Sequence, residues 1–206
     1  AIGPAALAKG NTSLALGRQS AATQDFAQAI GNVASATAKG SLAMGHSARA
    51  EGYRSIAIGS ADIEGAEPTG PQSGVKYQIN QQTVAGGKDS IALGAGANST
   101  KDYTLAIGAG SKATGINSLA TGFRAQANGP DSISMGTDAG VGATSAFKEN
   151  IAIGKGAGVN VQSEQNVAIG SGAGLDIKGG PGDDGLFGKN TLVGTGSGNK
   201  LTGAQN

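Results

Sequence analysis

The stretch "SLAMGHSARAEGYRSIAIG", residues 41–59, contains one short pattern twice. Serine, an aliphatic residue, alanine and a second aliphatic residue precede Gly45, and the same order precedes Gly59, 14 residues later. Between the two glycines lie the small residues Ala48 and Ala50 in alternation. The stretch has too much glycine for an ordinary core and too much regularity for a linker, so it indicates an internal repeat.

The glycine that closes this pattern, here called the anchor glycine, recurs along most of the chain. It occurs every 14 residues in two series, at Gly3, Gly17, Gly31, Gly45 and Gly59, and at Gly94, Gly108, Gly122 and Gly136. Later anchors at Gly154, Gly170 and Gly194 follow at intervals of 18, 16 and 24 residues. Counted from each anchor, positions 3 and 5 are small, position 10 is usually Ser or Thr, and positions 11 and 13 are usually aliphatic.

Each repeat contains two segments that alternate with a period of two residues. Aliphatic, small, aliphatic runs such as Ile56-Ala57-Ile58 predict one strand, and the small residues at positions 3 and 5 predict a second, shorter strand. Glycines between them suit positive φ angles at corners. Two strands and two corners in 14 residues predict one coil of a β-solenoid, with coils hydrogen-bonded at a spacing of ~4.8 Å.

The composition excludes several other classes of protein. Glycine makes up 38 of 206 residues, aromatic residues are 3%, and tryptophan is absent, so large side chains cannot fill a globular core. A net charge of +1 gives no electrostatic signature of nucleic-acid or anionic-membrane binding. Without cysteine there is no disulfide framework. The sequence contains no run of 18 apolar residues, so we expect no direct membrane insertion by this segment. No signal peptide is found, and we expect a fragment of a longer protein.

The two faces of the main strand make different demands. We expect the alanines to fill a thin coil interior, which places two aliphatic columns on the outside. The area of this apolar surface is larger than a monomer usually exposes. Leaving it in contact with water would lose a burial free energy on the order of tens of kcal/mol. A second copy must then cover it; the opposite assignment, with aliphatic residues inside the coil, stays open. The expected interface residues are Leu42, Met44, Ile56, Ile58, Ile91, Leu93, Leu105 and Ile107.

A few polar residues interrupt the pattern. Gln28 and Thr121 occupy aliphatic positions, and Asn150, Asn166 and Asn190 replace the serine at position 10. On an oligomer axis such residues would pair with their symmetry copies or hold a water or an ion. The alternative is that they are local imperfections of a long array.

The strings "SLAMGHSARAEG", "SIALGAGANST", "TLAIGAGSKATG" and "NVAIGSGAG" resemble the head repeats of trimeric autotransporter adhesins, the family of the Yersinia adhesin, and similar heads occur in Moraxella and Acinetobacter adhesins. The resemblance is close over residues 1–59 and 90–136 and looser over 150–206. It implies an all-β homotrimer of left-handed parallel β-rolls at the cell surface, on a fibre anchored in a Gram-negative outer membrane. It also implies adhesion to host matrix proteins such as collagen, fibronectin and laminin, or to abiotic surfaces. A segment of a phage or tailspike-like trimeric fibre is the alternative.

We interpret residues 1–206 as one repeat-built head domain, with regular coils at 1–59 and 90–136, an inserted loop at 60–89 and irregular coils at 137–206. Insertions in solenoids emerge on one face and are often binding sites. The loop is therefore a candidate ligand site; alternatively, it packs across the neighbouring subunit. Its candidate ligand-binding residues are Glu64, Glu67, Lys76 and Tyr77.

The sequence offers little for catalysis or metal binding. Residues 179–188, "GGPGDDGLFG", fit a calcium nonapeptide in which Asp184 would be a ligand. Such sites need a second stacked copy, which does not follow, so a surface turn is the favoured interpretation. His46 is the only histidine, and without a cysteine, a second histidine or a pair of carboxylates it does not indicate a catalytic or metal cluster. We expect no enzyme, no cofactor and no bound metal.

Overall fold

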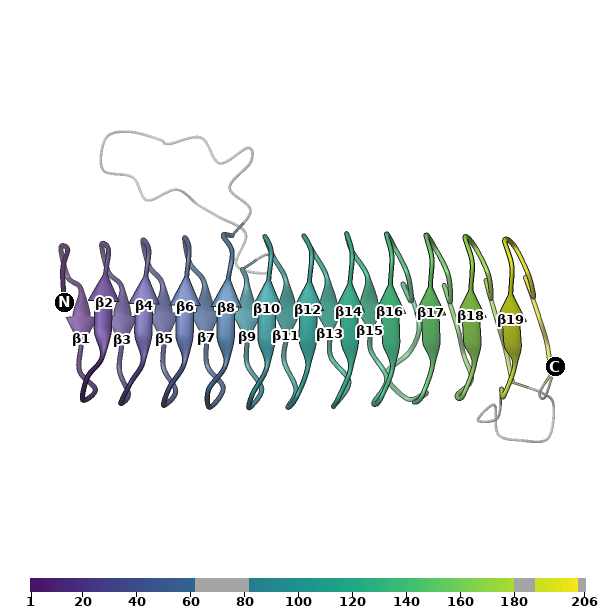
Figure 1. The fold of residues 1–206 in the computed structure, drawn as a ribbon, viewed down its shortest axis with the longest axis horizontal. Helices are drawn as coiled ribbons and strands as arrows, with labels where there is room; N and C mark the ends of the chain where they lie inside the picture. The colour runs from purple at the N-terminus through teal and green to yellow at the C-terminus, as the bar shows by residue number, and fades with distance from the viewer. Residues whose placement is uncertain (62–81, 180–187, 204–206) are drawn as a thin grey trace.

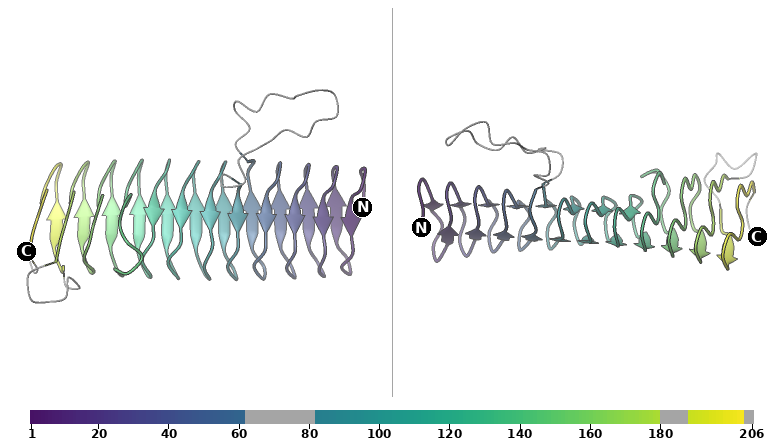
Figure 2. Two further views of the ribbon diagram at one scale, coloured as in Figure 1. Left: turned by 180° about the vertical axis from the view of Figure 1, so that it is seen from behind. Right: turned by 90° about the horizontal axis from the view of Figure 1, so that it is seen from above.

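The computed structural model describes residues 1–61, 82–179 and 188–203, and over these the chain winds into a rod of stacked coils (Figure 1). Two parallel sheets run along the rod, a long sheet of eleven strands and a short sheet of eight strands. Seen from above, they form two layers joined by corners (Figure 2). The described residues contain strands, turns and bends but no helix. The predicted parallel β-solenoid is confirmed.

The strands fall where the two alternating segments of the repeat lie. The long sheet consists of β2 (Leu14–Leu16), β4 (Gln28–Ile30), β6 (Leu42–Met44), β8 (Ile56–Ile58), β10 (Ile91–Leu93), β12 (Leu105–Ile107), β14 (Leu119–Thr121), β16 (Ile133–Met135), β17 (Ile151–Ile153), β18 (Val167–Ile169) and β19 (Thr191–Val193). The short sheet consists of β1 (Leu7–Ala8), β3 (Ala21–Ala22), β5 (Ser35–Ala36), β7 (Arg49–Ala50), β9 (Val84–Ala85), β11 (Asn98–Ser99), β13 (Lys112–Ala113) and β15 (Gln126–Ala127).

The strands stack in strict register, so each residue lies beside the residue at the same position of the next coil. In the long sheet, Ala43 pairs with Ala57 while Met44 pairs with Ile58. The repeat therefore becomes a set of columns that run along the rod. A property shared by one position in every coil is a property of a whole face.

Alanine fills the coil interior. Ala43 and Ala57 at the centres of long-sheet strands, Ala50 in the short sheet and Ala48 just before it are 0% exposed and belong to one core cluster. Their side chains are a single methyl group, so the two sheets can approach closely. This finding settles the orientation that the sequence left open: the alanines lie inside and the aliphatic columns lie outside.

The anchor glycines are required by both backbone conformation and space. Gly45 has φ +123°, a region that residues with a side chain rarely adopt. A Cβ on Gly45 would lie 2.1 Å from the carbonyl oxygen of Gly59 in the next coil. The anchor column is thus one place where successive backbones come too close to admit a side chain.

The hydroxyl groups at position 10 stabilise the opposite corner from inside. The Ser41 hydroxyl donates to the Ala38 carbonyl at 2.7 Å, and the Ser90 hydroxyl donates to the Gly87 carbonyl at 2.7 Å. Both serines are buried. A short side chain with a donor is needed there because buried corner carbonyls must find partners.

Asparagines take over this role in the C-terminal coils and form a ladder. Asn166 donates from Nδ2 to Asn150 Oδ1 at 3.0 Å and accepts at Oδ1 from Asn190 Nδ2 at 2.8 Å. Asn166 and Asn190 are buried inside the coil, so these residues do not lie on an oligomer axis. Here the core also becomes larger, with Val161, Ile177 and Leu192 packed together.

The inserted segment enters between two elements of one coil. β9 pairs with β7 through Val84 and Arg49, and the Ala61 amide still donates to the His46 carbonyl at 3.0 Å. Coil position 2 is therefore Ala61 and position 3 is Thr83. In the sequence, residues 62–82 are therefore the extra residues, and the described chain leaves the coil after Ala61 and resumes it at Thr83, just before β9.

Candidate functional site

The outer face of the long sheet is apolar along the whole rod. Positions 11 and 13 of every coil point outward there, and they are aliphatic or methionine except at Gln28, Thr121 and Thr191. In the eleven strands of the long sheet, no outward-facing residue carries a charge. We call this surface the apolar face.

The residues predicted for the oligomer interface all lie on the apolar face. Each is flanked by its own column in the coils above and below, for example Ile91 by Ile56 and Leu105, and is open on its remaining side. Met44 is 37% exposed and Leu93 is 42% exposed, and the other six are partly buried. The structure thus brings the eight residues together on one surface; it contains a single copy of the chain and does not show what covers them.

The outer face of the short sheet has the opposite character. Its outward residues and those beside them are mostly hydroxyl, amide or charged, including Thr37, Thr100, Lys112 and the ion pair between Arg49 and Glu51. Such side chains are well solvated and favour a surface that faces water. One side of the rod is therefore suited to a partner and the other side to solvent.

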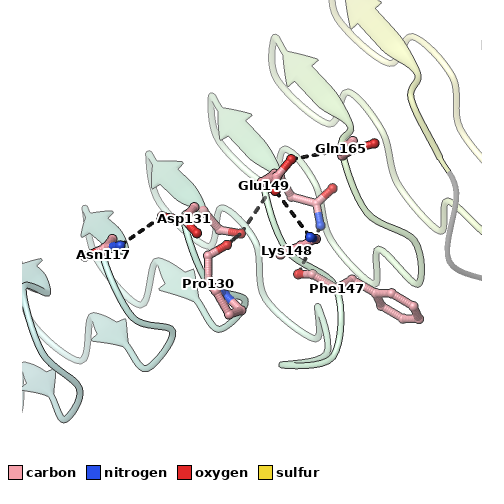
Figure 3. Close-up of polar contacts among 9 residues, drawn as sticks. Asn117, Pro130, Asp131, Phe147, Lys148, Glu149 and Gln165 are labelled. Carbon is pink, nitrogen blue, oxygen red and sulfur yellow. Dashed lines mark hydrogen bonds and ion pairs between the residues drawn. The ribbon is translucent and has the colours of Figure 1, made fainter.

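Polar side chains also join successive coils at the corner before position 10. Asn117 donates from Nδ2 to Asp131 Oδ1 at 3.0 Å, and Gln165 donates from Nε2 to Glu149 Oε2 at 2.8 Å (Figure 3). The backbone continues the same connection, since the Glu149 amide donates to the Pro130 carbonyl at 2.9 Å. Stacking of identical corners places these side chains one coil apart, within hydrogen-bonding reach.

Two bidentate ion pairs reinforce the corners. Arg54 donates to both carboxylate oxygens of Asp89 at 2.6 and 2.8 Å, and Arg124 donates to those of Asp138 at 2.7 and 2.9 Å. The hydrogen bond from each arginine lowers the pKa of its aspartate partner. The Arg54–Asp89 pair joins the coils before and after the insertion, although 35 residues separate the partners.

Three exposed aromatic side chains at the corners each lie beside a positively charged side chain. Arg54 lies 5.1 Å from the ring centre of Tyr53, Lys88 lies 5.6 Å from that of Tyr103, and Arg124 lies 4.9 Å from that of Phe123. Tyr103 also raises the pKa of Lys88 through a hydrogen bond. The aromatic rings are thus held by cation–π contacts rather than by burial.

The candidate ligand-binding residues of the inserted loop, Glu64, Glu67, Lys76 and Tyr77, lie outside the described residues, as does Asp184 of the calcium motif. Within the described ranges, no group of three or more His, Cys, Asp or Glu side chains is gathered. Nor does that part of the chain contain a helix long and apolar enough to cross a membrane.

Comparison with known families decides what these coils are. The model of the YadA head domain repeat matches residues 1–20, 8–34, 36–61, 85–111 and 113–139, which together cover more than half of the chain. The chain belongs to the YadA head family. A comparison with curated proteins found no match.

Membership in the YadA head family confirms the resemblance drawn from the repeats and identifies an adhesin-like head of a trimeric autotransporter. The YadA head matches stop at residue 61 and resume at residue 85, on either side of the insertion. They end at residue 139, where the strict 14-residue spacing of the anchors also ends. The extra and irregular segments are therefore where this chain departs from the YadA head repeat.

The corner pairs of this YadA head were missed from the sequence. A signal was available, because Arg124 and Asp138, like Asn117 and Asp131, are 14 residues apart and so occupy the same position in successive coils. Complementary charged or polar side chains spaced by one repeat therefore predict such pairs.

Proposed function

We propose that this chain forms the homotrimeric head of a bacterial surface adhesin and mediates adhesion of the cell. Three copies pack their apolar faces around a common axis, and residues 1–206 act as one head domain. The observation that carries the proposal is the uncharged apolar face, which continues from β2 to β19.

The size of the apolar face supports the trimer. At ~25 cal/mol per Å², covering two aliphatic columns along eleven strands stabilises the assembly by on the order of tens of kcal/mol. The alanine core inside each coil buries only methyl groups, so most of the large apolar side chains gain their burial from the neighbouring copies. The eight predicted interface residues are the centre of this contact.

The polar short sheet and the corners then face outward, where host matrix proteins such as collagen, fibronectin or laminin, or an abiotic surface, would be contacted. The inserted loop was expected at residues 60–89, but β9 and the residues next to it belong to the coil, so the proposed ligand site is the extra segment 62–82 with Glu64, Glu67, Lys76 and Tyr77. Its place at one corner between β8 and β9 supports this role, because a corner insertion does not interrupt the columns of either sheet. The head would project from the outer membrane of a Gram-negative cell.

The test of the ligand site is deletion of residues 62–82, which joins Ala61 at position 2 to Thr83 at position 3 and restores a 14-residue coil. Sedimentation should show a trimer for both the parent chain and the deletion variant, with the same thermal unfolding. A solid-phase panel of matrix proteins should show binding by the parent and at least a tenfold loss in the variant. Unchanged binding would refute the loop as the ligand site, and a stable folded monomer would refute the trimer.

A further inference from the structure

The apolar face poses a problem of alignment between copies. Its coils repeat about every 4.8 Å with aliphatic side chains in the same two columns. Sliding one copy by a whole coil along another therefore places aliphatic residues against aliphatic residues again, and loses contacts only at the two ends. Apolar burial holds the copies together but discriminates poorly between registers.

Two polar side chains break the uniformity of the apolar face in its regular part. Gln28 in β4 lies between Leu14 and Leu42 in its column, and Thr121 in β14 lies between Ile107 and Met135. Gln28 is exposed and Thr121 is partly buried. Neither side chain makes a hydrogen bond to the described part of its own chain.

The positions of these two residues make them sensitive to sliding. Gln28 occupies position 11 and Thr121 occupies position 13, and strands β6 to β12 lie between them. Because β14 lies five steps along the long sheet from β4, a slide by one coil does not bring one residue against the other. A slide by one coil in either direction puts both against aliphatic side chains of the neighbouring copy.

We propose that Gln28 and Thr121 set the axial register in which the copies assemble. In the aligned assembly each meets its own counterpart from the other copies. A glutamine amide has both donors and an acceptor, and a hydroxyl both donates and accepts, so identical residues can bond to one another around an axis. In a slipped assembly the same groups would be buried unpaired, which is unfavourable. This inference rests on the proposed trimer.

The chain carries a built-in reporter of register. Its only two methionines, Met44 and Met135, both lie on the apolar face, in the strands that follow β4 and β14 in the long sheet. With ¹³C-methyl methionine, an aligned symmetric trimer gives one methyl signal for each. Copies in mixed registers place each methionine in several environments and give additional signals.

The test compares this spectrum for the parent chain, the double variant Gln28→Leu with Thr121→Val, and the control Leu14→Ile with Leu119→Ile, which alters neighbouring residues without changing polarity. We expect two signals for the parent and the control. We expect the double variant to remain a trimer by sedimentation, with at least one additional signal and no lower thermal midpoint.

Two signals from a trimeric double variant would overturn the proposal, as would additional signals from the parent. A monomeric parent would instead refute the trimer itself, so the two failures are distinguishable. The single variant Thr121→Val is nearly isosteric and keeps the test valid should the double variant not assemble. On its own it should broaden or split the Met135 signal, and an unchanged signal would count against Thr121.

Discussion

At the scale of the residue, glycine at the anchor position is what allows the coils to stack. Gly45, with φ +123°, approaches the carbonyl of Gly59 so closely that a methyl group would overlap it. Gly40 also has positive φ, at +68°, but a Cβ there would lie 3.5 Å from its nearest neighbour, a side-chain atom of Arg54. Non-glycine residues such as Arg54 adopt the left-handed conformation at the same corner position. The corner position of Gly40 therefore accepts side chains, whereas the anchor position of Gly45 does not.

The two glycines predict different costs for the same substitution. Gly45→Ala should destabilise the fold by about 3 kcal/mol or more, because the backbone conformation is strained and the next coil must move. Gly40→Ala should cost about 1 kcal/mol, the usual penalty of a left-handed alanine. Urea unfolding of both variants measures the difference, with the unfolded-state effect of glycine removal common to both. Equal losses would contradict a special role of the anchor column.

At the scale of the element, each coil is joined to the next by backbone hydrogen bonds and by pairs of side chains at the corners. Arg54 with Asp89 and Arg124 with Asp138 are exposed, so solvent screens their attraction. Their geometry is nevertheless bidentate, and it lowers the pKa of both aspartates. The corner pairs thus couple the stacking of coils to pH.

The sign of this coupling follows from the lowered aspartate pKa values. A carboxyl group whose pKa is lower in the folded state contributes stability above its unfolded pKa of about 4, and that contribution disappears as the pH falls through the folded value. The urea midpoint should therefore decrease as the pH is lowered below about 5. In the variant Asp89→Asn with Asp138→Asn this fall should be shallower. An identical slope for the variant would show that the pairs do not contribute.

At the scale of the whole molecule, the rod has one face without charge and an opposite face rich in polar groups. Packing within a single copy explains the alanine interior but leaves Met44 and Leu93 more than a third exposed. The assembly proposed here completes their burial. Folding of one copy and association of three are therefore expected to occur together.

A charge on the apolar face is expected to prevent assembly. Ile107→Glu would bury carboxylates among aliphatic side chains, at several kcal/mol for each charge. Lys112→Glu, on the outer face of the short sheet, is the matched control and should leave assembly unchanged. Sedimentation velocity should show loss of the trimer, and thermal unfolding a lower midpoint, for Ile107→Glu alone. Normal assembly of that variant would show that the apolar face is not the interface.

The family model and the structure also show which predictions rest on strong sequence signals. The 14-residue spacing of the anchors, the strands such as Ile56–Ile58 and the absence of helix from the described residues follow from periodicity and glycine content. The ligand-binding role of Glu64, Glu67, Lys76 and Tyr77 remains a prediction. The insertion occurs once in the chain, so its residues cannot be compared with equivalent positions in other repeats.

The sequence by itself determined the repeat, the position of the anchor glycines and the alternation of the strands, because all three are local and recur at a fixed spacing. Only the tertiary structure decided which side of that alternation is the inside. A period of two places neighbouring residues on opposite faces but does not say which face meets the other sheet. Close approach of the two sheets leaves room inside for the methyl groups of residues such as Ala43 and Ala57, so the larger side chains beside them point outward.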